Sequence, residues 1–277
     1  MPELPEVELV ARALNDLVGA RRVVRARLLR PALAPETSPA AFARGLRGRT
    51  VGRVGRRGKH ILFEFDAGLV LIAHLRMTGR FLLLPRGAPL PKHTHATFEM
   101  DDGRTLVFTD QRHFGMMKLV ASRELSGAKE LRALAPEPFS DDFTPDYLRR
   151  VFARTRRTLK ETLLDQTKVT GLGNIYAAEA LFIARVSPFV AAAELSARRL
   201  PRLHRAIIEV FTESIAHGST MNVDPEDIDG SYYGGAYEGR WRVYDREGEP
   251  CVNCRARIRR AAHGGRSTYF CPRCQRR

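Results

Sequence analysis

The four cysteines of this chain stand in two pairs within its last 27 residues. They read Cys251-Val-Asn-Cys254 and Cys271-Pro-Arg-Cys274, with 16 residues between the pairs. Two CxxC turns at this distance are typical of a zinc ribbon, in which each turn supplies two thiolates to a tetrahedral ion. Because four protein ligands leave no open coordination position, the spacing predicts one structural zinc ion. Disulfides or a redox pair are the weaker alternatives, since no βαβ pattern surrounds either CxxC.

The charge of the chain points to a polyanionic partner. Its 46 Lys and Arg oppose 31 Asp and Glu, which gives a formal net charge of +15. Such a field concentrates phosphate backbones near the surface, although ribosomal and membrane-surface proteins share this excess. Between the two cysteine pairs the sequence carries a cationic hairpin tip formed by Arg255, Arg257, Arg259, Arg260 and Arg266. The acidic, proline-rich start does not resemble a signal peptide, so we expect a cytoplasmic protein.

Hydrophobic periodicity predicts two larger domains before the ribbon. Apolar residues recur at helical spacing over residues 7–17, and strand patterns follow over residues 61–72 and 96–108, each interrupted by a tight turn. The region up to about residue 120 therefore reads as a β-sandwich. Helical periodicity resumes after a proline-rich linker at residues 134–138 and continues to residue 216. A Gly- and Asp-rich stretch from Met221 to Gly239 reads as a long surface loop, and such loops often carry function.

The first residues combine a proline with a carboxylate. Once Met1 is removed, Pro2 becomes a terminal secondary amine directly beside Glu3. The pKa of an α-amino group is about 8 and that of a lysine side chain is about 10.4. At neutral pH a much larger fraction of a terminal amine is therefore unprotonated and able to attack. Pro2 and Glu3 are therefore a candidate nucleophile and proton donor. The alternative is that Pro5 and Glu6 only start a helix.

Three further segments allow both a functional and a structural interpretation. Residues 170–174 read Thr-Gly-Leu-Gly-Asn between two helical runs, and a basic cluster with Arg156 and Lys160 precedes them. A helix start beside basic residues suits a DNA backbone, but for the two glycines alone a tight helix-to-helix connection is the favoured explanation. Met77, Arg112 and Phe114 fall at turns after strands, where they are either wedges for a base stack or core residues. Lys59 opens a strand and is either functional or merely solvated.

The segments together resemble bacterial formamidopyrimidine-DNA glycosylases, in the order found in that family. The matching pieces are Pro2-Glu3-Leu4-Pro5-Glu6-Val7-Glu8, Gly58-Lys59, His74-Leu75-Arg76-Met77, Asp110-Gln111-Arg112-His113-Phe114-Gly115, Gly171-Leu172-Gly173-Asn174-Ile175-Tyr176 and the four-cysteine ribbon. The resemblance implies an α+β fold: an N-terminal β-sandwich with an N-terminal helix over residues 1–135, a helix-two-turn-helix domain with a lesion-capping loop over residues 136–238, and a zinc-ribbon finger over residues 239–277.

The resemblance also implies an activity. Members excise 8-oxoguanine and formamidopyrimidines through a Schiff base on the terminal proline and then nick the strand by β,δ-elimination. The implied catalytic residues are Pro2, Glu3, Lys59 and Arg266. The implied DNA contacts are His74, His93, Arg112, Arg156, Lys160 and Asn174, with Met77, Arg112 and Phe114 intercalating and Cys251, Cys254, Cys271 and Cys274 holding zinc. The implied partner is double-stranded DNA with oxidised bases or abasic sites, bound by a nucleoid-associated monomer.

Two departures from the family pattern bear on substrate choice. The family commonly has Asp-Pro-Arg-Arg-Phe-Gly where this chain has Gln111 and His113, which weakens one cationic contact. The loop over residues 221–239 matches poorly, and its acidic residues are Asp224, Glu226, Asp227 and Asp229. An endonuclease VIII-like enzyme for oxidised pyrimidines is the nearest alternative, against which Leu4 and the Arg112/Phe114 pair argue. A non-enzymatic zinc-ribbon DNA-binding protein is the alternative from another class.

Overall fold

The computed structural model describes residues 2–228, 230 and 235–276, and these form two compact units. The first unit comprises residues 1–132 and 218–236, and the second comprises residues 133–217 and 237–277. The loop that the sequence assigned to the helical domain thus makes its contacts with the first unit over residues 218–236. The expected domain boundaries at residues 135 and 238 stay a prediction.

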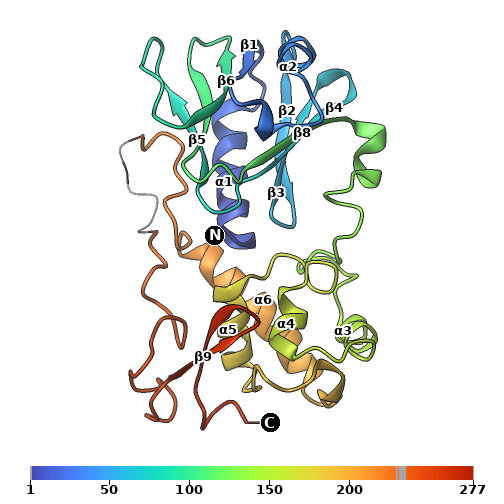
Figure 1. Cartoon of the computed structure of the whole chain (residues 1–277), viewed down its shortest axis with the longest axis vertical. Coiled ribbons are helices and arrows are strands. Elements are labelled where there is room, and N and C mark those ends of the chain that lie inside the picture. The colour runs from blue at the N-terminus through green and yellow to red at the C-terminus, as the bar shows by residue number, and fades with distance from the viewer. Residues whose placement is uncertain (1, 229, 231–234, 277) are drawn as a thin grey trace. The chain divides into compact units, whose positions relative to one another are not determined.

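The first unit is built from two four-stranded antiparallel sheets and a long N-terminal helix (Figure 1). One sheet has the order β1-β6-β7-β5 and the other the order β2-β3-β4-β8. The elements are α1 (Leu4–Val18), β1 (Val23–Leu28), η1 (Pro31–Leu33), α2 (Pro39–Leu46), β2 (Val51–Arg57), β3 (His60–Phe65), η2 (Asp66–Gly68), β4 (Leu69–His74), β5 (Gly79–Leu84), β6 (Thr94–Met100), β7 (Thr105–Asp110), β8 (Met116–Ala121) and η3 (Ser122–Gly127).

Helix α1 shares one hydrophobic core with both sheets. Its buried residues Val7, Leu14 and Val18 recur on one face and join a cluster with side chains from both sheets, including Phe63 and Phe98. Burial of this apolar stripe is the main force that holds an amphipathic helix in place. The predicted sandwich, its first helix and both predicted hairpins are confirmed.

The second unit is helical and ends in a two-stranded hairpin. Its elements are α3 (Pro145–Phe152), α4 (Leu159–Leu164), α5 (Asn174–Ile183), η4 (Ala192–Glu194), α6 (Leu200–Ala216), β9 (Arg259–His263) and β10 (Arg266–Phe270). Helix α5 packs against α6 and the β9–β10 hairpin, and Phe182 and Tyr269 belong to one small core around the ribbon. Within the described ranges, no helix has both the length and the apolar composition needed to cross a membrane.

Candidate functional site

The start of α1 holds Pro2 and Glu3 in a buried position. Glu3 is the N-cap of the helix and is 2% exposed, and its backbone N–H donates to the Glu6 carboxylate at 2.8 Å. This capping box satisfies backbone groups that the first helical turn leaves without a partner. The predicted helix start at these residues is therefore confirmed, and it fixes the Pro2–Glu3 backbone beside the positive end of the helix.

Glu6 also connects this helix start to the loop of the first unit. Its second carboxylate oxygen accepts a hydrogen bond from the Thr220 hydroxyl at 2.9 Å, and both residues are buried. A carboxylate shared by the Glu3 backbone and Thr220 makes the position of the helix start depend on the loop. Sequence reasoning missed Glu6 as a site residue, although its three-residue spacing from Glu3 is the signal for a capping box.

Lys59 lies in the tight turn between β2 and β3 and is only 6% exposed. The Glu8 carboxylate and the Arg56 guanidinium, 2.6 Å apart, connect the N-terminal half of α1 to the end of β2. The ion pair therefore brings the Lys59 turn to the end of the sheet at which α1 begins. Because its side chain is buried, Lys59 is not the solvated surface lysine that the sequence allowed as an alternative.

His74 ends β4 and is neutral. The register pairs it with His60 of β3, and the two rings meet edge to face with centroids 4.6 Å apart. Burial, with a smaller contribution from the charges of His60, Arg76 and Lys59, lowers the pKa of His74 to about 2. The Arg76 N–H donates to His74 Nδ1 at 3.0 Å, so the remaining proton sits on Nε2. His74 can therefore serve a phosphate as a neutral donor.

The two turns that carry Met77, Arg112 and Phe114 lie together. Strands β5 and β7 pair Gly79 with Asp110, which brings the turn before β5 against residues 110–115, here called the wedge loop. The Thr78 hydroxyl donates to the Asp110 carboxylate and accepts the Arg112 N–H at 3.1 Å. The Arg112 guanidinium stacks 5.0 Å from the centre of the Phe114 ring, which is 54% exposed. An exposed aromatic ring held by a cation is poorly explained as core packing.

Asp110 and two glycines explain the shape of the wedge loop. The Gly115 N–H donates to the Asp110 carboxylate at 2.6 Å. Burial alone would raise the pKa of Asp110, but hydrogen bonds from Thr78 and the wedge-loop backbone outweigh it and lower the pKa below its usual value. A Cβ atom at either Gly79 or Gly115 would come within 2.7 Å of the Phe108 ring, so both turns need glycine to approach the same ring.

In the second unit, α4 and α5 flank a double turn at residues 165–173. The Gln166 side chain organises it by accepting the Gly171 N–H at 3.0 Å and donating to the Leu172 carbonyl at 2.9 Å. Asn174 follows at the first position of α5 and donates to the Ser267 carbonyl at 3.1 Å. This arrangement is a helix-two-turn-helix motif whose turn contacts the β9–β10 hairpin. Gln166 carried no sequence signal of its own.

Lys160 lies elsewhere than the sequence suggested. It is 1% exposed, and its ammonium donates to the Ser267 carbonyl at 2.9 Å and to the Thr268 hydroxyl at 2.6 Å. These bonds hold the hairpin, and the direct DNA contact expected of Lys160 stays a prediction. Arg156 and Arg266 are exposed as expected. Arg266 lines a cavity of about 420 Å³ together with Arg157, Lys160, Glu161, Leu164, Asp165, Gln166, His263 and Gly264.

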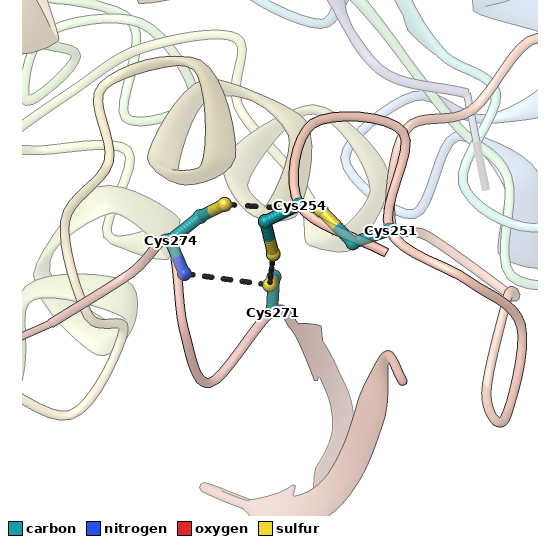
Figure 2. A group of neighbouring side chains, drawn as sticks. All are labelled: Cys251, Cys254, Cys271 and Cys274. Atoms are coloured by element: carbon teal, nitrogen blue, oxygen red, sulfur yellow. Dashed lines mark hydrogen bonds between the residues drawn. The ribbon is translucent and has the colours of Figure 1, made fainter. Parts of the chain in front are cut away.

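The four cysteine sulfurs converge on one point (Figure 2). Cys251 Sγ lies 3.8 Å from Cys274 Sγ, and Cys254 Sγ lies 3.5 Å from Cys271 Sγ. A tetrahedral ion with zinc–sulfur bonds of about 2.3 Å spaces its sulfurs about 3.8 Å apart, so the cysteines fit one zinc ion. Backbone N–H groups of Asn253 and Cys274 donate to Cys251 and Cys271 sulfurs, both at 3.4 Å, as expected for stabilised thiolates. The predicted structural zinc ion fits this geometry.

The acidic loop lies along strand β5. The Leu83 N–H donates to the Pro225 carbonyl at 2.8 Å, and the Arg80 guanidinium donates to the carbonyls of Asp227 at 2.8 Å and Gly230 at 3.2 Å. The loop contributes only backbone carbonyls to these hydrogen bonds, so they do not depend on the identity of its side chains. Asp229 lies outside the described residues.

The fold and these features define a class of protein: a β-sandwich unit that opens with a capped helix, and a helix-two-turn-helix unit that carries a four-cysteine ribbon. Family models match along the chain: the formamidopyrimidine-DNA glycosylase N-terminal domain over residues 1–117, the H2TH domain of the same enzyme over residues 134–224, and a zinc finger found in FPG and IleRS over residues 248–277.

Whole-chain relatives agree with these matches. The formamidopyrimidine-DNA glycosylase of Bacillus licheniformis is 42% identical over 280 residues and covers 100% of both chains, and that of Desulforamulus reducens is 40% identical over 277 residues, covering 100% of this chain and 99% of the relative. A crystal structure of Lactococcus lactis Fpg with abasic-site DNA is 32% identical, with a TM-score of 0.91 over 99% of this chain and 100% of that chain. The chain therefore belongs to the formamidopyrimidine-DNA glycosylase family.

Proposed function

We propose that this protein is a bifunctional DNA glycosylase and AP lyase of base excision repair that excises oxidised purines, 8-oxoguanine and formamidopyrimidines, from double-stranded DNA. The observation that carries the proposal is the buried start of α1. There Pro2, which gains a terminal secondary amine when Met1 is removed, directly precedes a carboxylate fixed as the helix cap. An amine nucleophile beside a proton donor is the pair that Schiff-base chemistry on a sugar requires.

In the first step the Pro2 nitrogen attacks the anomeric carbon of the damaged nucleotide. The bond between that carbon and the base breaks, and the base leaves with the bonding electrons and takes up the proton that the Pro2 nitrogen releases. Glu3 protonates the ring oxygen as the sugar opens, which leaves an iminium between Pro2 and the sugar carbon. The base is excised at this point.

The iminium then acidifies the neighbouring C2′ proton. Its removal expels the 3′-phosphate, and a second elimination expels the 5′-phosphate. Hydrolysis finally releases the enzyme amine. We assign phosphate binding and proton transfer to Lys59 and support of the second elimination to Arg266.

The damaged nucleotide has to leave the stack before Pro2 can reach its sugar. Extrusion costs a few kcal/mol, and less for a damaged base. Met77, Arg112 and Phe114 would fill the vacated space, while His74, His93, Arg156 and Asn174 would hold the backbone. The contacts among Thr78, Asp110 and Arg112 support this role, since they assemble the wedge residues before DNA arrives. We expect the protein to act as a monomer.

An oxidised pyrimidine is a second candidate substrate. One of the similar solved structures is a complex of Lactococcus lactis Fpg with DNA containing an oxidised pyrimidine, with a TM-score of 0.91 and 32% identity. Comparing excision from duplexes with 8-oxoguanine and with thymine glycol separates the two. Faster release of 8-oxoguanine supports the proposal, and a preference for thymine glycol supports an endonuclease VIII-like specificity.

Borohydride trapping tests the chemistry. Reduction of the iminium should join the protein covalently to lesion-containing DNA, whereas a non-enzymatic DNA-binding protein gives no such product. A preparation that mass spectrometry shows to retain Met1 is the matched control, because its Pro2 nitrogen lies in a peptide bond. Equal trapping with and without Met1 would remove Pro2 from the mechanism.

A further inference from the structure

The wedge loop contains a histidine that the proposed mechanism does not use. His113 stands between Arg112 and Phe114, where the family commonly has a second arginine. It is exposed, and its backbone adopts a φ of 61°. An arginine is permanently charged, whereas an imidazole changes its charge near neutral pH. The chain therefore exchanges a fixed cation of the wedge loop for a titratable group.

A second histidine holds His113 in a defined protonation state. The buried His95 donates from Nε2 to the Asp110 carbonyl at 2.8 Å, since a carbonyl only accepts. The same N–H also faces His113 Nδ1 at 3.0 Å, so the two acceptors share one proton and Nδ1 itself carries none. His113 is therefore neutral in this arrangement, with its proton on Nε2.

The surroundings oppose protonation of His113. Partial desolvation by the neighbouring groups lowers its pKa below the usual value, the charges of Arg30, His95 and His93 act in the same sense, and Asp110 opposes them. The His93 and His95 rings lie 5.9 Å and 4.8 Å from the His113 ring. At neutral pH the free protein therefore keeps this imidazole uncharged.

We propose that His113 is a pH-dependent phosphate contact of the wedge loop, held back by His95 when neutral and released to the DNA backbone when protonated. A proton added at Nδ1 places a second N–H opposite the His95 Nε2–H, so the contact between the rings is lost. The freed imidazolium then has a charge-assisted donor for a phosphate beside the wedge. His95 acts as a positioning residue.

The sign of the pH dependence follows from linkage. A phosphate favours the charged imidazole, so the pKa of His113 is higher in the complex than in the free protein. Binding therefore takes up a proton, and DNA affinity rises as pH falls, at most about tenfold per pH unit for one proton. The charged form also releases one more counterion equivalent, which steepens the salt dependence of binding by about 0.9.

The inference rests on the proposed DNA function, and the experiment keeps the two apart. Affinity for a duplex with a stable abasic-site analogue is measured by fluorescence anisotropy over a salt series, at about pH 5.5 and about pH 8. Wild type is compared with His113→Arg and His113→Gln. All three proteins keep the neighbouring His93 and His95.

The wild-type salt slope should match His113→Gln at the higher pH and approach His113→Arg at the lower pH. Identical slope changes in all three proteins would overturn the role of His113, whereas absence of DNA binding by all three would refute the proposed function. An NMR titration of the His113 ring in wild type covers the case of a poorly folded variant. Its pKa should rise on DNA binding, and an unchanged pKa would also overturn the inference.

Discussion

Replacing Phe114 with alanine separates the wedge from the chemistry. The ring is 54% exposed in the free protein, so the truncation removes little buried area. Full burial of a large apolar side chain is worth about 1.5 to 3 kcal/mol, so the free energy of unfolding should fall by less than about 1.5 kcal/mol. Stacking of a base on an aromatic ring is worth about 1 to 3 kcal/mol. Lesion excision should therefore suffer much more than the fold.

That stacking energy corresponds to a loss of about 5- to 150-fold in kcat/KM on a lesion-containing duplex. Strand cleavage at a preformed abasic site in a single strand should be almost unchanged, since no stack has to be opened there. The assay is the ratio of the two rates for wild type and Phe114→Ala. Phe139→Ala is the matched control, because Phe139 is 46% exposed and lies in the other unit. Equal losses on both substrates, with an intact circular dichroism spectrum, would refute the wedge.

Three further outcomes are expected. Cys251→Ser should release the zinc ion, destabilise the ribbon and weaken DNA binding. Metal analysis should find one zinc ion per chain in the wild type, and fluorescence anisotropy should show the weaker binding of the variant. Full activity after chelation would contradict this prediction. Lys160→Met should weaken DNA binding without changing the salt slope, because its ammonium bonds to the protein, whereas Arg156→Gln should lower the slope by about 0.9. Burial lowers the pKa of His60 to about 4 and that of His74 to about 2, so only the unfolded chain takes up these protons just below pH 6.5. The free energy of unfolding in urea should therefore fall as pH drops from about 6.5 towards 5, less steeply in His74→Gln, and an identical slope in both proteins argues against a neutral buried His74.

Local patterns predicted the parts of the fold that depend on neighbouring residues. The strand patterns on both sides of the turn at residues 101–103 predicted the β6–β7 hairpin, and the CxxC spacing predicted the cluster of four cysteine sulfurs. Strand order has no such signal, because β1 pairs with β6 across more than sixty residues of sequence. The pairing of distant strands depends on how whole faces pack, which a local pattern does not contain.

The same distinction applies to the site. The sequence singled out Arg112 and Phe114 correctly as turn residues, but not the Asp110 carboxylate that shapes their turn. It also treated Lys160 as part of a basic surface, because a lysine in a cationic run looks solvated when its distant partner is unknown. The partner, the Ser267 carbonyl, lies 107 residues further along the chain.

That carbonyl has a consequence for comparisons among relatives. Ser267 accepts hydrogen bonds from Lys160 and Asn174 through its backbone carbonyl, and every residue type provides that acceptor. Selection on this joint should therefore fall on positions 160 and 174, whereas the Ser267 side chain serves a different contact, in which it accepts from Arg260 Nε at 2.9 Å. An alignment that ranks positions by conservation would overlook the residue at which the helix-two-turn-helix motif and the β9–β10 hairpin meet.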